Sequence, residues 1–202
     1  MTSHDTVTTE SAPRAIAYAG YPGAGKTEAA TYGLDWVGGE HVSMGQAVKE
    51  VALDELGPDA TSHEIGHWAT VSREVSGPDV MARRIVRKWQ EGGPPREPVH
   101  IEGVRSIHEV RAFQEMFGYV PILFIDAPFQ TRLDRLQERG RDGEADFGET
   151  DLLERDGREA NWGMADLDVL SQHRVPNEDS LGTLKNRVGS RLMNVLGLPR
   201  DN

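Results

Sequence analysis

The sequence predicts an α/β fold in which helices cover both faces of a five-stranded parallel sheet. Three observations predict it. Short apolar runs alternate with segments of helical periodicity along the whole chain. A glycine-rich turn joins the first apolar run directly to the first helical pattern. The chain has 202 residues, which is enough length for one domain that is stable without disulfides, and it contains no Cys.

Strands are expected where apolar runs are bounded by glycine, proline or polar residues, at 15–19, 41–43, 99–102, 121–126 and 173–176. The run at 121–126 is the clearest of them, because it is almost continuously apolar. Helices are expected at 25–36, 45–56, 61–75, 78–90, 106–117, 129–139, 150–162 and 181–196. The segment 140–148 is charged and carries glycines, so we expect a mobile loop there.

Composition limits the classes of partner. The formal net charge is −11, which argues against a long basic stripe, so no nucleic-acid partner is expected. Residues 1–13 are polar and lack the apolar core of a signal peptide, so they are predicted to be a disordered tail. The longest apolar stretch, 119–125, is far too short to cross a bilayer. We therefore expect a cytoplasmic protein with no membrane partner.

Residues 20–27 read G-Y-P-G-A-G-K-T, which matches G-x-x-x-x-G-K-T between a strand and a helix. Glycines let backbone N–H groups turn inward around a phosphate, and the following helix adds its positive end. Lys26 can bridge the β- and γ-phosphates of ATP, and the Thr27 hydroxyl can bind Mg²⁺. The alternative is a plain glycine-rich turn with a surface lysine. The predicted nucleotide-binding residues of this P-loop are Gly20, Pro22, Gly23, Ala24, Gly25, Lys26, Thr27 and Glu28.

Two acidic residues end predicted strands at the edge where open α/β sheets bind ligands. Glu102 ends the third strand and could hold Mg²⁺ or orient an acceptor hydroxyl. Arg105, three residues later, could grip an acceptor phosphate with two hydrogen bonds. Asp126 ends the fourth strand and is a second candidate metal ligand. The alternative for each acid is a helix N-cap or an ordinary loop carboxylate.

Arginines are dense between positions 132 and 158. Mobile guanidinium groups can neutralise a phosphoryl group in transfer and exclude water. Because they flank the expected loop, the favoured candidates for such a lid are Arg139, Arg141, Arg155 and Arg158. The alternative is a solvated helix face, with pairs such as Glu154 and Arg158 one turn apart.

The segment His63-Glu64-Ile65-Gly66-His67 matches H-E-x-x-H, the zinc motif of metalloproteases. The longer form of that motif fails, because Thr70 and Arg73 stand where a glycine and a third histidine belong. A zinc hydrolase is thus an alternative, and the preferred interpretation is the polar face of a helix.

The assembled pattern resembles the nucleotide-kinase branch of P-loop proteins, and more closely an archaeal family of dephospho-CoA-kinase-like and adenylate-kinase-like proteins. Beyond the P-loop, the resemblance rests on V-S-M-G at 42–45, S-R-E-V-S-G-P-D-V at 72–80, I-E-G-V-R-S at 101–106, E-R-G-R at 138–141, E-R-D-G-R-E-A-N-W-G at 154–163 and N-E-D-S-L at 177–181. It implies one domain over 14–202, with an acceptor-binding helical insertion at 43–90 and an arginine lid at 139–160. It also implies that Asn177 lies beside the base of ATP, that Arg135 or Arg139 stacks on that base, and that Arg73 faces the acceptor.

These observations predict a Mg²⁺- and ATP-dependent phosphotransferase acting on a nucleotide or nucleotide-like small molecule. The residues expected to act in catalysis are Lys26, Glu102, Arg105, Arg141, Arg155 and Arg158. The alternative is a slow regulatory P-loop NTPase that signals through a partner. The identity of the acceptor and the choice between ATP and GTP stay open at this point.

Overall fold

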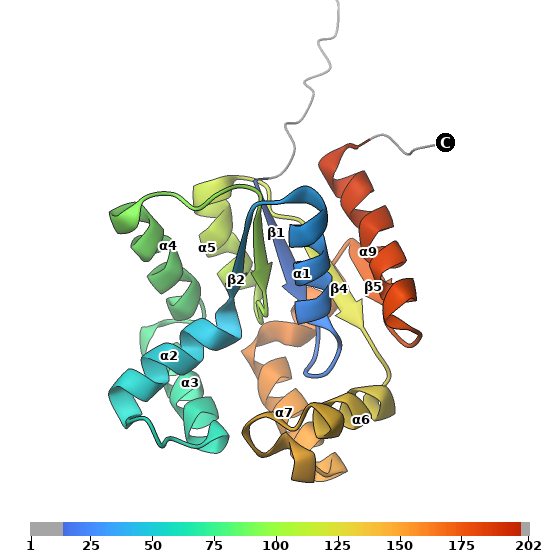
Figure 1. The fold of residues 1–202 in the computed structure, drawn as a ribbon. Coiled ribbons are helices and arrows are strands. Elements are labelled where there is room, and N and C mark those ends of the chain that lie inside the picture. Colours follow the sequence, from blue (N-terminus) through green and yellow to red (C-terminus); the bar gives the residue numbers. More distant parts are fainter. Residues whose placement is uncertain (1–13, 199–202) are drawn as a thin grey trace, which may run out of the picture.

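A computed structural model describes residues 14–198. Its centre is a five-stranded sheet with all neighbours parallel, in the order β2-β3-β1-β4-β5 (Figure 1). The strands are β1 (Ala15–Ala19), β2 (Glu40–Ser43), β3 (Val99–Glu102), β4 (Ile122–Asp126) and β5 (His173–Pro176). The predicted fold class is confirmed. The tail predicted at 1–13 lies outside the described residues.

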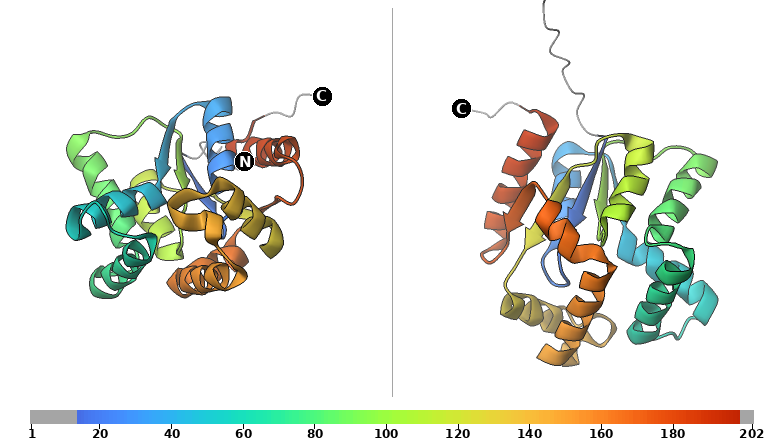
Figure 2. Two further views of the ribbon diagram at one scale, coloured as in Figure 1. Left: turned by 60° about the horizontal axis from the view of Figure 1, so that its bottom comes forward. Right: turned by 180° about the vertical axis from the view of Figure 1, so that it is seen from behind.

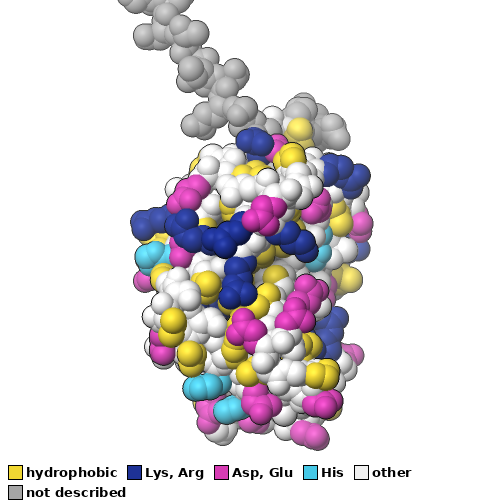
Figure 3. Space-filling model, turned by 90° about the vertical axis from the view of Figure 1, so that its left-hand side faces the viewer, with side chains coloured by type: hydrophobic (Ala, Val, Ile, Leu, Met, Phe, Trp, Pro, Cys, Tyr) yellow, Lys and Arg dark blue, Asp and Glu magenta, His cyan; other side chains and the backbone are white. Residues whose placement is uncertain are grey.

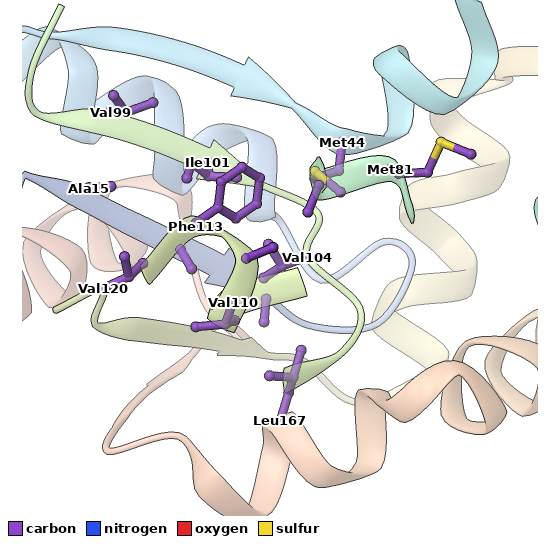
Figure 4. Packing of buried hydrophobic residues seen from close by; sticks show 14 of the residues in the cluster. Ala15, Met44, Met81, Val99, Ile101, Val104, Val110, Phe113, Val120 and Leu167 are labelled. Carbon is purple, nitrogen blue, oxygen red and sulfur yellow. The ribbon is translucent and has the colours of Figure 1, made fainter. Parts of the chain in front are cut away.

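Helices cover both faces of the sheet (Figure 2). Helices α1 (Lys26–Val37) and α9 (Leu181–Leu196) pack against one face, and α5 (Ile107–Phe117) and α8 (Ala165–Leu170) against the other. Successive β1 side chains point to opposite faces, so Ile16 and Tyr18 join the first layer while Ala17 joins the second. In the second layer Val110 and Phe113 of α5 cover the sheet (Figure 4). None of the helices between residues 14 and 198 has the length and apolar character needed to cross a membrane.

Helix α1 lies unusually close to the sheet at Gly33. A Cβ atom there would lie 2.4 Å from Tyr18 Oη and 2.9 Å from His100 Cε1. Tyr18 Oη is 2.8 Å from His100 Nδ1, so the missing side chain makes room for a buried polar pair. This close packing fixes the start of α1 relative to the end of β1, which is where the phosphate loop lies.

Three helices form the predicted insertion after β2: α2 (Met44–Leu56), α3 (Ser62–Ser76) and α4 (Val80–Gly92). Ser43 caps α2, because its side chain accepts a hydrogen bond from the Gln46 amide. A capping box of Thr61 and Glu64 starts α3. Trp89 of α4 packs against the rings of α5, which ties the insertion to the sheet layer.

The segment expected to be a mobile loop is instead partly helical. After α6 (Phe129–Arg139), a 3₁₀ helix spans Arg141–Asp146, and α7 (Glu149–Glu159) follows. Glu144 accepts hydrogen bonds from Arg139 and Arg155, and these charge-assisted contacts order a segment that local sequence signals describe as loop. A π-helical turn (Ala160–Met164), with Gly163 at φ 117°, then leads into α8, which the sequence did not predict.

One face of the molecule, around the helical insertion, shows a row of Lys and Arg side chains (Figure 3). Helix α4 exposes Arg83, Arg84, Arg87 and Lys88. Arg83 pairs with Asp79 and Glu115. Neighbouring carboxylates thus compensate part of this row, as on an ordinary solvated helix face.

Candidate active site

The segment between β1 and α1 turns sharply at three glycines with positive φ: Gly20 (139°), Gly23 (77°) and Gly25 (96°). A Cβ at Gly20 would lie 2.2 Å from the Ile125 carbonyl oxygen, and one at Gly25 would lie 2.4 Å from Asn177 Nδ2. Both the backbone conformation and the space therefore require glycine. The turn leaves the first amides of α1 without helical partners, which is the geometry of an anion site.

Lys26 is the first residue of α1, and its Nζ donates a hydrogen bond to the Tyr21 carbonyl at 3.0 Å. Burial lowers the pKa of Lys26 to about 8, although the nearby Glu159 carboxylate opposes the shift. A bound phosphate would supply the missing negative charge. Thr27, the next residue of α1, lines the same cavity as Lys26.

A cavity of about 640 Å³ opens in front of the phosphate loop. The loop and the helices α2, α3 and α7 all contribute to its wall. Its cationic residues are Lys26, Lys49, Arg73, Arg105, Arg139, Arg141, Arg155 and Arg158, and its acidic residues are Glu102, Glu144, Asp151, Glu154 and Glu159. Cations outnumber acids here although the chain carries a net charge of −11. The cavity is therefore suited to a polyanionic ligand.

Glu102 lies at the carboxyl end of β3, where the sequence placed it, and is 9% exposed. Its Oε1 accepts a hydrogen bond from Ser43 Oγ at 2.8 Å. Its Oε2 has no hydrogen-bond partner within the described part of the chain and lies 3.9 Å from His41 Nε2. Glu102 lines the cavity, and a buried carboxylate oxygen without a partner at this position fits a Mg²⁺ ligand or a hydrogen-bond acceptor for substrate.

Asp126 does not reach this cavity. Its carboxylate accepts a hydrogen bond from Arg174 at 2.8 Å, at the outer end of β4, and its side chain is 46% exposed. The structure thus places the second predicted metal ligand apart from Lys26 and Thr27. The reason is the strand order, because β4 lies on the side of β1 opposite to β3.

Asn177 is buried against the back of the phosphate loop. Its Nδ2 donates to the Ala24 carbonyl at 2.7 Å, and its Oδ1 lies 3.4 Å from Arg135 Nη2. Neither Asn177 nor Arg135 lines the main cavity. Asn177 thus holds the loop directly and Arg135 contacts Asn177, and contact of either side chain with an ATP base stays a prediction.

Arg105 and the lid arginines do converge on the cavity. Arg105 Nε lies 3.4 Å from Glu159 Oε1, and Arg105 Nη1 donates to the Gly103 carbonyl. Arg155 contacts both Glu144 and Glu159, at 2.9 and 3.9 Å. Arg139, by contrast, is held by Glu144 at the cavity rim, and Arg141 lines the rim as an exposed side chain.

Arg158 differs from Arg139 and Arg155, which acidic side chains hold. No ion pair joins it to an acid among residues 14–198, and its Nε has no hydrogen-bond partner there. Its guanidinium carbon lies 5.8 Å from the centroid of the Trp162 ring. Arg73 and Arg105 approach the same ring, at 4.4 and 5.7 Å.

Sequence reasoning missed Glu159 and Trp162. Glu159 looks like a surface partner of Arg155 one turn earlier, yet it is 3% exposed. Burial, by itself, would raise the pKa of Glu159, but Arg105, Lys26 and Arg155 together hold the pKa below its ordinary value. The only local signal was the E-R-D-G-R-E-A-N-W-G string, which carries no periodicity that marks a buried acid.

The H-E-x-x-H segment forms the start of α3. Glu64 is engaged in the capping box with Thr61, and both His63 and His67 are exposed. Within residues 14–198 no group of three or more His, Cys, Asp or Glu side chains gathers in a way that could hold a metal. The H-E-x-x-H segment therefore has the hydrogen bonding of a capped helix N-terminus.

The parallel strand order, the glycine loop and the cavity in front of it define the P-loop kinase fold. Two solved structures share it. The shikimate kinase of Bacteroides thetaiotaomicron is 17% identical, with a TM-score of 0.60, and the match covers 93% of this chain and 100% of that chain. A gluconokinase of Sinorhizobium meliloti 1021 is 12% identical, with a TM-score of 0.56, and the match covers 93% of this chain and 95% of that chain. At these identities the likeness shows the fold alone.

The family follows from a closer relative. The UPF0200 protein of Methanosarcina acetivorans is 35% identical over 183 residues, which cover 90% of this chain and 95% of the relative. The chain therefore belongs to the UPF0200 family, and the predicted resemblance to an archaeal family is confirmed at that level. No protein-family model matches the chain. The likeness to dephospho-CoA kinase in particular stays a prediction.

Proposed function

We propose that this protein transfers the γ-phosphoryl group of Mg²⁺–ATP to a nucleotide or nucleotide-like small molecule. One observation carries the proposal: a single cavity runs from the phosphate loop to the helical insertion and has cationic side chains on both sides. A kinase needs that second side for its acceptor, whereas an NTPase that only hydrolyses needs room for water.

On the nucleotide side, the loop amides and Lys26 bind the β- and γ-phosphates. The residues suited to hold Mg²⁺ are Thr27, through its hydroxyl, and Glu102, through its unpartnered Oε2. The bound ion would neutralise phosphate charge as the bond to the leaving group breaks. Glu28 lies in the first turn of α1, and Arg135 and Asn177 keep the loop in place from behind.

On the acceptor side, Arg105, Arg155 and Arg158 stabilise the phosphoryl group and bind the acceptor, and Arg139 and Arg141 close the rim. Trp162 lines the same part of the cavity and offers an aromatic surface that suits a flat ring. This combination of an aromatic surface with several cations supports a nucleotide-like acceptor over an uncharged sugar.

The test is an ADP-release assay with the purified protein, Mg²⁺–ATP and a panel of nucleosides, nucleoside monophosphates and dephospho-CoA. We expect ADP release that depends on one acceptor class and stops when EDTA removes the Mg²⁺. ATP hydrolysis that proceeds equally without any acceptor would instead identify a regulatory NTPase and would overturn the proposal.

A further inference from the structure

Glu159 is a buried carboxylate that lines the cavity, and only one of its oxygens has partners. Oε1 lies 3.4 Å from Arg105 Nε and 3.9 Å from Arg155 Nε. Oε2 has no hydrogen-bond partner in the part of the chain that the structure describes. The side chain is 4% exposed, so solvent contact does not compensate for the missing bond. A buried acceptor of this kind is costly unless a ligand donates a hydrogen bond to it.

The position of Glu159 lies between the two halves of the site. Lys26 of the phosphate loop lines the same cavity, and its charge lowers the pKa of Glu159. Arg105 holds it from the other side, where the guanidinium of Arg105 also approaches Trp162. The carboxylate is therefore placed where a γ-phosphoryl group and an acceptor would meet.

A second acid, Glu102, does not take the same role. Its Oε1 is bound to Ser43, and it lies at the end of the sheet, where we place the metal. Glu159 belongs to α7 instead and has three cations around it: Lys26, Arg105 and Arg155. Two carboxylates in one cavity with different neighbours are suited to different tasks.

The chemical nature of the acceptor follows from this arrangement. A phosphate oxyanion as nucleophile would bring further negative charge, and no proton, against the free carboxylate oxygen. A hydroxyl group would donate a hydrogen bond to that oxygen and would lose its proton to it during transfer. The unpartnered oxygen thus favours an alcohol over a phosphate as the attacking group.

The cluster around Trp162 adds a second requirement. Three guanidinium groups, those of Arg73, Arg105 and Arg158, lie within 5.8 Å of the ring centroid. Arg73 pairs with Glu109 and Arg105 with Glu159, whereas Arg158 has no acidic partner among residues 14–198. An anionic group on the acceptor would balance the remaining charge.

We propose, on the basis of the function proposed above, that Glu159 is the catalytic base and that the acceptor is an alcohol that also carries an anionic group. The acceptor oxygen forms a bond to the γ-phosphorus while the bond from that phosphorus to the β,γ-bridging oxygen breaks. ADP leaves with the electron pair of the broken bond. The hydroxyl proton passes to Glu159 Oε2 and is released to solvent after the products leave the cavity.

The first experiment identifies the bond that forms. The purified protein is incubated with Mg²⁺–ATP and one of two sets of compounds. The first set contains nucleoside 5′-monophosphates, sugar phosphates and hydroxy acids. The second set contains 2′,3′-dideoxynucleoside 5′-monophosphates, which have no ribose hydroxyl to phosphorylate. Phosphorus NMR distinguishes a new phosphomonoester from a new phosphoanhydride. We expect a phosphomonoester with a compound of the first set and no transfer with the second.

A phosphoanhydride product would overturn this inference and leave the kinase proposal intact. ATP turnover without transfer to any compound, or no ATP turnover at all, would overturn the kinase proposal itself and this inference with it.

The second experiment changes the base. Glu159→Gln keeps the shape of the side chain and removes its basicity, so kcat for the acceptor found above should fall about 100-fold or more. Binding of a non-hydrolysable ATP analogue should change by less than about threefold, because the phosphate loop is intact. Glu159→Asp should recover part of kcat and also covers the case in which the Gln variant does not fold.

The matched control is Glu149→Gln, an exposed acid of the same helix, which should keep wild-type kcat. A Glu159→Gln variant that folds and keeps kcat within about fivefold of the wild type would rule out a base at this position. The same conclusion would follow if the Gln variant failed to fold and Glu159→Asp lost analogue binding in parallel with kcat.

Discussion

The two halves of the cavity are built by different means. The proposed nucleotide side depends mainly on backbone geometry, because three positive-φ glycines and the start of α1 form the loop that carries Lys26. On the acceptor side, long charged side chains from α3, α7 and the end of β3 meet around Trp162 and Glu159. Backbone curvature is set by neighbours in the sequence, whereas a side-chain cluster depends on distant segments meeting.

The two halves are therefore sensitive to different kinds of substitution. The loop is enclosed by close contacts, such as those of Gly20 with the Ile125 carbonyl and of Gly25 with Asn177, so it tolerates no added volume at these positions. The acceptor side is instead a balance of opposite charges, so loss of one charge changes binding or stability according to whether its partner is left buried.

The largest effect is expected from Lys26→Ala. Loss of the phosphate-binding ammonium group should lower kcat/KM for ATP by about 1,000-fold or more. The melting temperature should not fall, because burial holds the pKa of Lys26 down to about 8 and removing a desolvated charge relieves that cost. Steady-state kinetics and thermal unfolding measure the two quantities. Lys88→Ala, on the exposed face of α4, is the control, and equal activity in both variants would refute the assigned site.

Two arginine variants should separate binding from stability, because Arg158 lies beside Trp162 whereas Arg132 contacts Asp156 and the Pro22 carbonyl of the phosphate loop. Arg158→Ala should raise KM for the acceptor by roughly 10- to 100-fold at unchanged stability, because Arg158 has no acidic partner among residues 14–198. Arg132→Ala should instead lower the unfolding free energy by about 3 kcal/mol, because it removes the two bonds of Arg132 to Asp156 and leaves that carboxylate behind. Steady-state kinetics measures acceptor binding, and denaturant unfolding measures stability. If both variants lost only acceptor binding, or both lost only stability, the expected difference between the two arginines would be contradicted.

A pair of glycine variants compares packing in the two halves. Gly33→Ala places a Cβ 2.4 Å from Tyr18 Oη and should lower the unfolding free energy by about 1–3 kcal/mol. Gly157→Ala, inside α7 with no atom within 4 Å of the new Cβ, should raise it by about 0.5–1 kcal/mol through reduced chain entropy. Denaturant titration measures the unfolding free energy of both variants. An increase in both would show that the structure relaxes freely around the close approach at Gly33.

The smallest effect is expected from Asp126→Asn. Its carboxylate pairs with Arg174 at a half-exposed position outside the cavity, and such pairs contribute about 0–1 kcal/mol. We expect kcat within about twofold of the wild type and an unchanged dependence on Mg²⁺ concentration, in assays run beside Glu102→Gln. A loss of Mg²⁺ dependence limited to the Asp126 variant would restore Asp126 as the metal ligand.

Local patterns predicted much of this protein. All five strands, the insertion helices and the phosphate loop lie where the sequence places them, because each depends on short-range signals such as apolar runs, caps and glycines. The 3₁₀ helix at Arg141–Asp146 was missed, because its order comes from Glu144 and two arginines. The sequence favours Glu102 over Asp126 as the metal ligand, but only the strand order shows that Asp126 lies outside the cavity.

The sequence by itself determined the P-loop and its place between β1 and α1, since the backbone conformation of eight consecutive residues is a local property. Only the tertiary structure decided that Glu159 is a buried acid between Lys26 and Arg105, and that Arg158 has no acidic partner within residues 14–198. The physical reason is that burial and charge pairing depend on which distant segments pack together. An identical Arg-Glu spacing on an exposed helix would have left the same residues in water.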